Sequence, residues 1–251
     1  MSFTTILSTL ALSALVRAAP TPSTDDVYPN YEYGNMFYLG PTTNSQYITK
    51  ATYSLSVPAP PTDYLTSSPD ERWLSLWIGL QDNPNTSDVL DMNFVQPLLN
   101  WGPNNAIWGC DADVEHWCAA ASTYTPAEQI GQEYVALPSN ATLDFVVEVN
   151  ADTGMIDQSI SLAGKIISQE SDSKGMQPAV FYSGTECYLD GCGTVDAHSW
   201  FNITLELNEA DADLDKTMTL TGATSSGMVT TDGGKTWTIE SIVIEKQNMT
   251  E

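Results

Sequence analysis

The sequence predicts an all-β protein built as an antiparallel β-sandwich, and three observations support this. Apolar and polar residues alternate with a period of two in several segments, turn-forming residues separate those segments, and no long amphipathic helix is evident. A strand with one face on a core shows this alternation, because successive side chains point to opposite faces. The length of 251 residues fits one large domain of this class.

Five segments carry the alternating pattern most clearly. In the first, Tyr53, Leu55 and Val57 alternate with small polar residues. In the fourth segment, Met218 and Leu220 continue the alternation. The segments are 53–57, 143–149, 201–208, 218–220 and 236–245. We expect the apolar face of each, which includes Phe201 in the third, to point into the core.

The N-terminal region predicts a processed segment and one folded domain. Residues Ile6–Val16 form an apolar run that is too short to span a bilayer, and small residues follow it. We therefore expect a signal peptide at residues 1–19 and a secreted, extracellular protein. Residues 20–47 are rich in aromatic side chains without a clear period, so we expect an irregular or edge segment there. Residues 48–251 form the predicted sandwich domain.

Four cysteines agree with an exported protein. They are Cys110, Cys118, Cys187 and Cys192. An even count in a secreted chain predicts disulfides, with three possible pairings. The pairing of sequence neighbours, Cys110 with Cys118 and Cys187 with Cys192, is favoured. The spacing does not suit zinc, so we expect neither a metal nor a cofactor.

Four Asn-x-Ser/Thr sequons are present. In a secreted protein such asparagines are candidate glycosylation sites at the surface. They are Asn85, Asn140, Asn202 and Asn248.

The net charge limits the possible partners. The chain has 32 acidic and 8 basic residues, which gives a net charge of −24. Such a surface repels nucleic acid and anionic membranes, and it disfavours polyanionic substrates. We therefore expect a monomer that acts on a polypeptide or a polysaccharide, without a nucleic-acid or membrane partner.

The segment 88–101 predicts an interrupted strand. Its apolar residues also fit helical spacing, but a helix would hold Pro97 in its interior at a cost of about 3 kcal/mol. A strand tolerates proline at an edge or an irregularity. We therefore predict a strand that is irregular at Pro97. In that strand Phe94, Gln96, Leu98 and Asn100 share one face.

The most informative part of the chain is Trp73–Cys110, which contains four of the seven tryptophans. Gln96 is a polar residue among apolar neighbours there, and it needs an explanation beyond core packing. An amide can stabilise an oxyanion, and a nearby carboxylate can act as a general base towards water. The segment therefore predicts a hydrolytic site if a carboxylate lies close to Gln96.

Four short motifs resemble the glutamic peptidases, or eqolisins, which are secreted acid endopeptidases. The motifs are Val57-Pro58, Trp77-Ile78-Gly79-Leu80, Phe94-Val95-Gln96 and Leu205-Glu206. The resemblance implies a concanavalin A-like jelly roll, with Glu206 as the general base and Gln96 as the oxyanion donor. It also implies activity near pH 3–4, as expected for a glutamate with an ordinary pKa of about 4.3. One departure is that the family has glycine two residues after its glutamine, whereas this chain reaches Gly102 only later.

Other functions remain open. In a non-catalytic carbohydrate-binding sandwich, exposed tryptophans would stack on sugar rings, and Trp77 and Trp101 are the candidates for substrate binding. A polysaccharide lyase with tyrosine or histidine as its base is a further alternative, and so is a role in protein interaction.

Several motifs are better explained as structure. Asp152-Thr153-Gly154 matches an aspartic-protease tripeptide, but that chemistry needs two such carboxylates. Residues 230–237 resemble a single Asp-box hairpin, and residues 211–215 an acidic turn. Because no Gly-x-Ser-x-Gly elbow is present, a serine hydrolase based on His198 is not expected.

Overall fold

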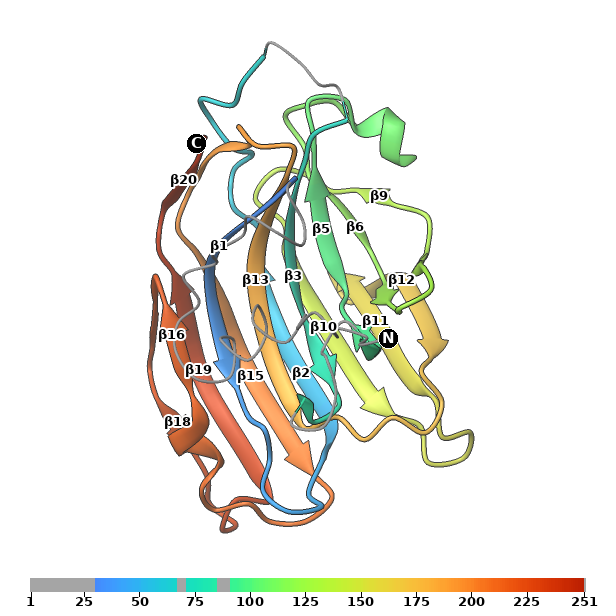
Figure 1. Ribbon diagram of the computed structural model, residues 1–251, viewed down its shortest axis with the longest axis vertical. Coiled ribbons are helices and arrows are strands. Elements are labelled where there is room, and N and C mark those ends of the chain that lie inside the picture. The colour runs from blue at the N-terminus through green and yellow to red at the C-terminus, as the bar shows by residue number, and fades with distance from the viewer. Residues whose placement is uncertain (1–29, 67–70, 85–90, 251) are drawn as a thin grey trace, which may run out of the picture.

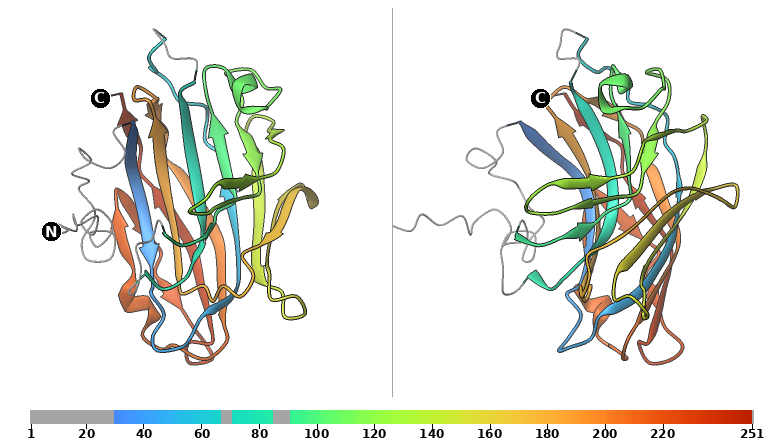
Figure 2. Two further views of the ribbon diagram at one scale, coloured as in Figure 1. Left: turned by 45° about the vertical axis from the view of Figure 1, so that its right-hand side comes forward. Right: turned by 90° about the vertical axis from the view of Figure 1, so that its right-hand side faces the viewer.

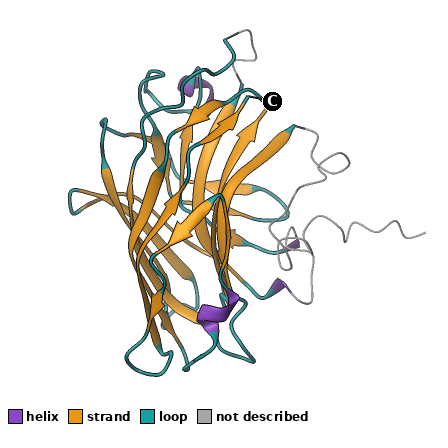
Figure 3. Ribbon diagram, turned by 90° about the vertical axis from the view of Figure 1, so that its left-hand side faces the viewer, coloured by secondary structure: helices purple, strands orange, loops and turns teal. Residues whose placement is uncertain are grey.

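A computed structural model describes residues 30–66, 71–84 and 91–250 (Figure 1). The predicted signal peptide and the sequon at Asn85 lie outside these residues. Strands dominate the described part, and its helical segments are short 3-10 turns, among them η3 (Asn105–Trp108) and η4 (Leu214–Thr217) (Figure 3). Within the described residues, no helix is long and apolar enough to cross a membrane.

Two antiparallel sheets stack face to face, which confirms the predicted β-sandwich with its jelly-roll layout (Figure 2). Sheet A follows the order β16-β1-β13-β3-β4-β7-β8, with β5, β6 and β9 attached beside β3. Its strands are β1 (Tyr31–Leu39), β3 (Trp73–Gln81), β4 (Phe94–Val95), β5 (Leu98–Trp101), β6 (Cys118–Ala120), β7 (Ser122–Tyr124), β8 (Gln129–Gly131), β9 (Val135–Ala136), β13 (Val180–Tyr188) and β16 (Thr219–Thr221).

Sheet B follows the order β12-β11-β10-β2-β15-β19-β17, and β18 pairs with β19. Its strands are β2 (Ile48–Ser56), β10 (Thr142–Val149), β11 (Ile156–Leu162), β12 (Lys165–Asp172), β15 (His198–Leu207), β17 (Ala223–Ser225), β18 (Met228–Val229) and β19 (Thr236–Ile244). A small third sheet joins β14 (Gly193–Val195) to β20 (Gln247–Met249). The segment 20–47, expected to be irregular or an edge, contributes β1 to sheet A between β16 and β13.

The core lies between the two sheets, and most of its residues lie on the faces that the alternating pattern predicts to be buried. Tyr53, Leu55 and Phe145 are buried, as their pattern predicts. One strand differs, because a bulge in β15 shifts its register against β2 between Phe201 and Thr204. The bulge turns Trp200 into the core with 0% exposure and leaves Phe201 half-buried, so the inward position predicted for Phe201 is wrong.

The strand interruption at Pro97 is confirmed. β4 and β5 pair with β3 in one continuous register, and Gln96 and Pro97 separate them. The backbone approaches β3 closely here, since a Cβ on Gly79 would lie 2.0 Å from the carbonyl oxygen of Val95. Glycine at position 79 therefore allows the interrupted strand to stay on the sheet.

Both disulfides form between sequence neighbours, as predicted. Cys110 bonds Cys118 at a Cα–Cα distance of 6.4 Å, and Cys187 bonds Cys192 at 5.9 Å. The first closes the loop between β5 and β6, and the second closes the loop after β13. Each bridge fixes a loop at one end of sheet A.

Candidate functional site

The structure does not bring the predicted pair, Gln96 and Glu206, together. Gln96 belongs to sheet A, whereas Glu206 lies on β15 of sheet B, opposite Lys50 of β2. Its neighbours Leu205 and Leu207 are 0% and 1% exposed, so Glu206 points away from the core into solvent. The sandwich core separates the two residues, and their assignment to one catalytic site is corrected.

Gln96 lies at the break between β4 and β5. Its backbone N–H donates to the carbonyl oxygen of Ser122 at 2.8 Å, and its side chain is half-buried. Phe94 and Leu98 on either side pack in a separate cluster with Trp77, away from the core between the sheets. They lie on the outer face of sheet A, defined here as the face turned away from sheet B.

The two tryptophans proposed for substrate binding have different positions. Trp77 lies on the outer face of sheet A, but it is only 7% exposed. Trp101 is fully buried in the core, and its indole N–H donates to the carbonyl oxygen of Val114 at 2.7 Å. A substrate-binding role for Trp101 is therefore wrong, because no ligand can reach its ring.

One row of residues crosses the outer face of sheet A. Glu186 of β13 lies opposite Ser75 of β3, and Ser75 lies opposite Asn100 of β5. The strands β13, β3 and β5 lie side by side in Figure 1. Strands in a sheet are about 4.8 Å apart, so the Cα atoms of Glu186 and Asn100 are about 10 Å apart. Their side chains extend from the same face, and a carboxyl group and an amide thus share one stretch of surface.

Glu186 has the environment of a functional carboxyl group. It is half-buried, and desolvation raises its pKa to about 7. The indole N–H of Trp77 donates to Oε2 at 2.8 Å, which stabilises the carboxylate and offsets part of that rise. Gly184 makes room for this contact, since a Cβ there would lie 2.5 Å from the Trp77 ring.

Asn100 has an amide with one unsatisfied end. The residue is 9% exposed, and its Nδ2 donates to the Tyr134 hydroxyl oxygen at 2.7 Å. Within the described residues, Oδ1 has no hydrogen-bond partner. Rotating the amide by half a turn lets the tyrosine hydroxyl donate to Oδ1 and frees the NH₂ group as a donor. Burial raises the pKa of Tyr134 to about 12, so its hydroxyl stays protonated.

Aromatic side chains flank this row on both sides along the strands. On one side, the centroid of the Trp77 ring lies 5.5 Å from that of Phe94 and also 5.5 Å from that of Tyr182. On the other side, Trp73 stacks on Tyr188 at 5.6 Å. The polar row thus lies in apolar surroundings, which accounts for the desolvation of Glu186.

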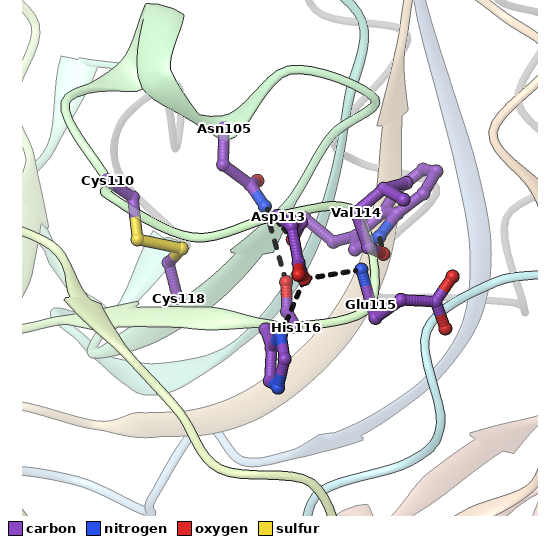
Figure 4. A network of polar contacts seen from close by, with 8 residues as sticks. Asn105, Cys110, Asp113, Val114, Glu115, His116 and Cys118 are labelled. Carbon is purple, nitrogen blue, oxygen red and sulfur yellow. Dashed lines mark hydrogen bonds and ion pairs between the residues drawn. A yellow bond between two sulfur atoms is a disulfide. The ribbon is translucent and has the colours of Figure 1, made fainter.

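A disulfide-closed loop carries Trp108 to the end of this face, next to Trp73. Figure 4 shows the Cys110–Cys118 bridge and Asn105 of this loop. Asn105 organises the loop, because its side chain donates to the carbonyl oxygens of Asp113 and His116 and accepts from the N–H of Gly102. Trp108 ends the η3 turn, and its ring lies edge-on to Trp73 at 6.3 Å.

The remaining motifs have structural roles or stay open. Asp232 accepts the backbone N–H groups of Lys235 and Thr236, which makes residues 230–237 a capped hairpin. Burial lowers the pKa of His198 to about 4.

The sequons in the described part are exposed at Asn140, Asn202 and Asn248. Within the same residues, no group of three or more potential ligands could hold a metal ion.

Sequence reasoning missed Glu186 and Asn100. One signal points to Asn100, since Leu98-Leu99-Asn100 is followed by Gly102, the glycine two residues on that the peptidase pattern requires. Asparagine then stands where that family has glutamine. No comparable signal marks Glu186, which lies between Thr185 and Cys187 and becomes notable only through its strand partners.

No protein-family model and no curated protein matches the chain. Among solved structures, it is similar to a basic winged bean lectin with Tn-antigen, with 13% identity, a TM-score of 0.32, and 86% of this chain and 73% of that one covered. It is similar to a legume lectin-like domain from Entamoeba histolytica, with 10% identity, a TM-score of 0.31, and 86% and 90% covered. A Bacillus licheniformis β-glucanase gives 8% identity, a TM-score of 0.32, and 85% and 79% covered. These values carry no information about function.

Proposed function

We propose that the outer face of sheet A is a hydrolytic site that resembles the site of the glutamic peptidases. Glu186 is the proton-exchanging carboxyl group, and Asn100 is the amide that stabilises the oxyanion. The observation that carries this proposal is the row Glu186–Ser75–Asn100, in which a desolvated carboxyl group and an amide with a free end share one face.

In this reaction the Glu186 carboxylate takes a proton from water as the water oxygen attacks the substrate carbonyl carbon. The carbonyl oxygen becomes an oxyanion, and the Asn100 NH₂ donates a hydrogen bond to it. Glu186 then gives its proton to the leaving nitrogen as the C–N bond breaks, which restores the carboxylate. The Trp77 N–H holds one carboxylate oxygen throughout and leaves the other for water.

The raised pKa changes the expected pH range. A carboxyl group with a pKa of about 7 is protonated at acid pH and cannot take a proton from water there. We therefore expect the rate to rise as the pH increases through about 7, rather than to peak near pH 3–4 as an ordinary glutamate would predict.

The test is digestion of a denatured protein from about pH 4 to about pH 9. Glu186→Gln should lower the rate by a factor of about 100 or more, and Asn100→Leu should have an effect of similar size. Glu206→Gln, on the far face of sheet B, is the matched control and should leave the rate unchanged. Full activity of the Glu186→Gln protein, or no cleavage by the parent protein at any pH, would contradict the proposal.

A second candidate is carbohydrate binding on the same face. It is favoured by the aromatic groups on both sides of the row, where Trp73 and Tyr188 are only partly buried. Amides, hydroxyls and aromatic rings are the groups that recognise neutral sugars.

We further propose that the protein works outside the cell as a glycosylated monomer, since its two disulfides suit an oxidising compartment.

A further inference from the structure

We infer that the groove between Trp108 and Tyr134 binds a neutral hydroxylated ring, a hexopyranose. This inference deepens the second candidate function, because it names the ligand class and the place where that ligand binds. It does not depend on the chemistry of Glu186, and its test is separate from the digestion assay.

The groove has a volume of about 670 Å³, which lies within the range of small-ligand sites. The residues that line it include Ala120, Ser122 and the aromatic residues Trp108 and Tyr134. Ala120 lies opposite Leu98 in the sheet, so the groove continues the outer face beyond the Asn100 row. One sugar ring with its hydroxyl groups fits this space.

The Trp108 ring is held in place before any ligand arrives. The Cys110–Cys118 disulfide and the hydrogen bonds of Asn105 fix its loop (Figure 4). The Trp108 ring also meets the Trp73 ring edge-on at 6.3 Å. A ring fixed in this way loses little conformational entropy when a ligand stacks on it, which favours binding.

The polar side chains that line the groove indicate the ligand chemistry. Gln129 and Gln132 are exposed amides in the lining, and each amide carries both a donor and an acceptor. A hydroxyl group both donates and accepts, so a polyhydroxylated ligand can satisfy groups of both kinds. The side chain of a phenylalanine or leucine would leave such atoms unpaired at a cost in binding.

Charge decides between neutral and acidic sugars. Glu133 lines the groove, and none of the residues described as lining it is basic. With a net charge of −24 on the chain, a uronic acid or a sulfated sugar is repelled. The expected ligand is therefore an uncharged sugar.

The test is NMR titration of the full chain with methyl glucoside, methyl galactoside and methyl mannoside. We expect at least one to bind with a Kd on the order of 1 mM, and glucuronic acid to bind at least about tenfold more weakly. Trp108→Ala should weaken binding at least about tenfold. Ile107→Ala changes an exposed neighbour in the same turn and should leave binding unchanged.

A second variant keeps the test decisive if Trp108→Ala does not fold. Gln132→Ala removes an exposed amide from the groove lining and should weaken binding about threefold. The inference is overturned if no methyl glycoside binds at about 50 mM, if N-acetylphenylalaninamide binds more tightly than every glycoside, or if Trp108→Ala binds as well as the parent. Digestion and sugar binding are measured in separate assays, so loss of digestion and loss of sugar binding have distinguishable causes.

Discussion

Replacing Glu186 with glutamine should make the stability of the protein less dependent on pH. The folded protein raises the pKa of Glu186 from 4.5 to about 7, so between these values the folded state holds a proton that the unfolded state releases. The carboxyl group therefore costs no stability below about pH 4.5 and costs progressively more as the pH rises through about 7. A shift of this size corresponds to about 3 kcal/mol, and partial exposure to water reduces the expected effect to about 2 kcal/mol.

The assay is urea unfolding of the parent and the Glu186→Gln protein from about pH 4 to about pH 8, with both disulfides intact. The stability of the variant relative to the parent should increase by about 2 kcal/mol over this range, or about 4–8 °C in Tm. Effects that do not depend on pH, such as a changed bond from Trp77, cancel in this comparison. A constant difference across the range would refute the argument that Glu186 is desolvated.

Three further predictions follow from other contacts. Burial lowers the pKa of His198 from 6.5 to about 4. Between these two pH values the unfolded state binds a proton at His198 that the folded state does not bind. His198→Gln should therefore gain up to about 3 kcal/mol over the parent between about pH 7 and pH 4, measured by urea unfolding. Gly184→Ala should displace the Trp77 indole, and its N–H resonance should shift in an NMR spectrum; an unchanged resonance would contradict the contact. Replacing Cys187 and Cys192 with alanine should cost about 2 kcal/mol in calorimetry, because the bridge closes a short loop, and unchanged stability would contradict this.

Much of the fold could be predicted because local pattern determines it. The alternation around Tyr53 and Phe145 identifies strands and their buried faces, and Pro97 marks an interruption that the structure contains. The bulge at Asn202 could not be predicted, since one extra residue in β15 leaves the sequence pattern intact while it turns Trp200 inward.

The site was harder to predict because it depends on which strands become neighbours. Glu206 follows apolar residues as the peptidase pattern requires, but nothing in its own strand tells which sheet it joins. Glu186 and Asn100 are 86 positions apart by their residue numbers and meet only because both flank Ser75. Pairings of this kind arise from topology, and a single sequence does not carry that information locally.

The central claim is that Glu186 is a desolvated, proton-exchanging carboxyl group on the outer face of sheet A. The most direct measurement is an NMR titration of the protein labelled with ¹³C at the glutamate carboxyl carbons, with Glu186→Gln used to assign the resonance. We predict a pKa of about 7 for Glu186. A pKa near 4.5, the ordinary value for a glutamate, would contradict the account.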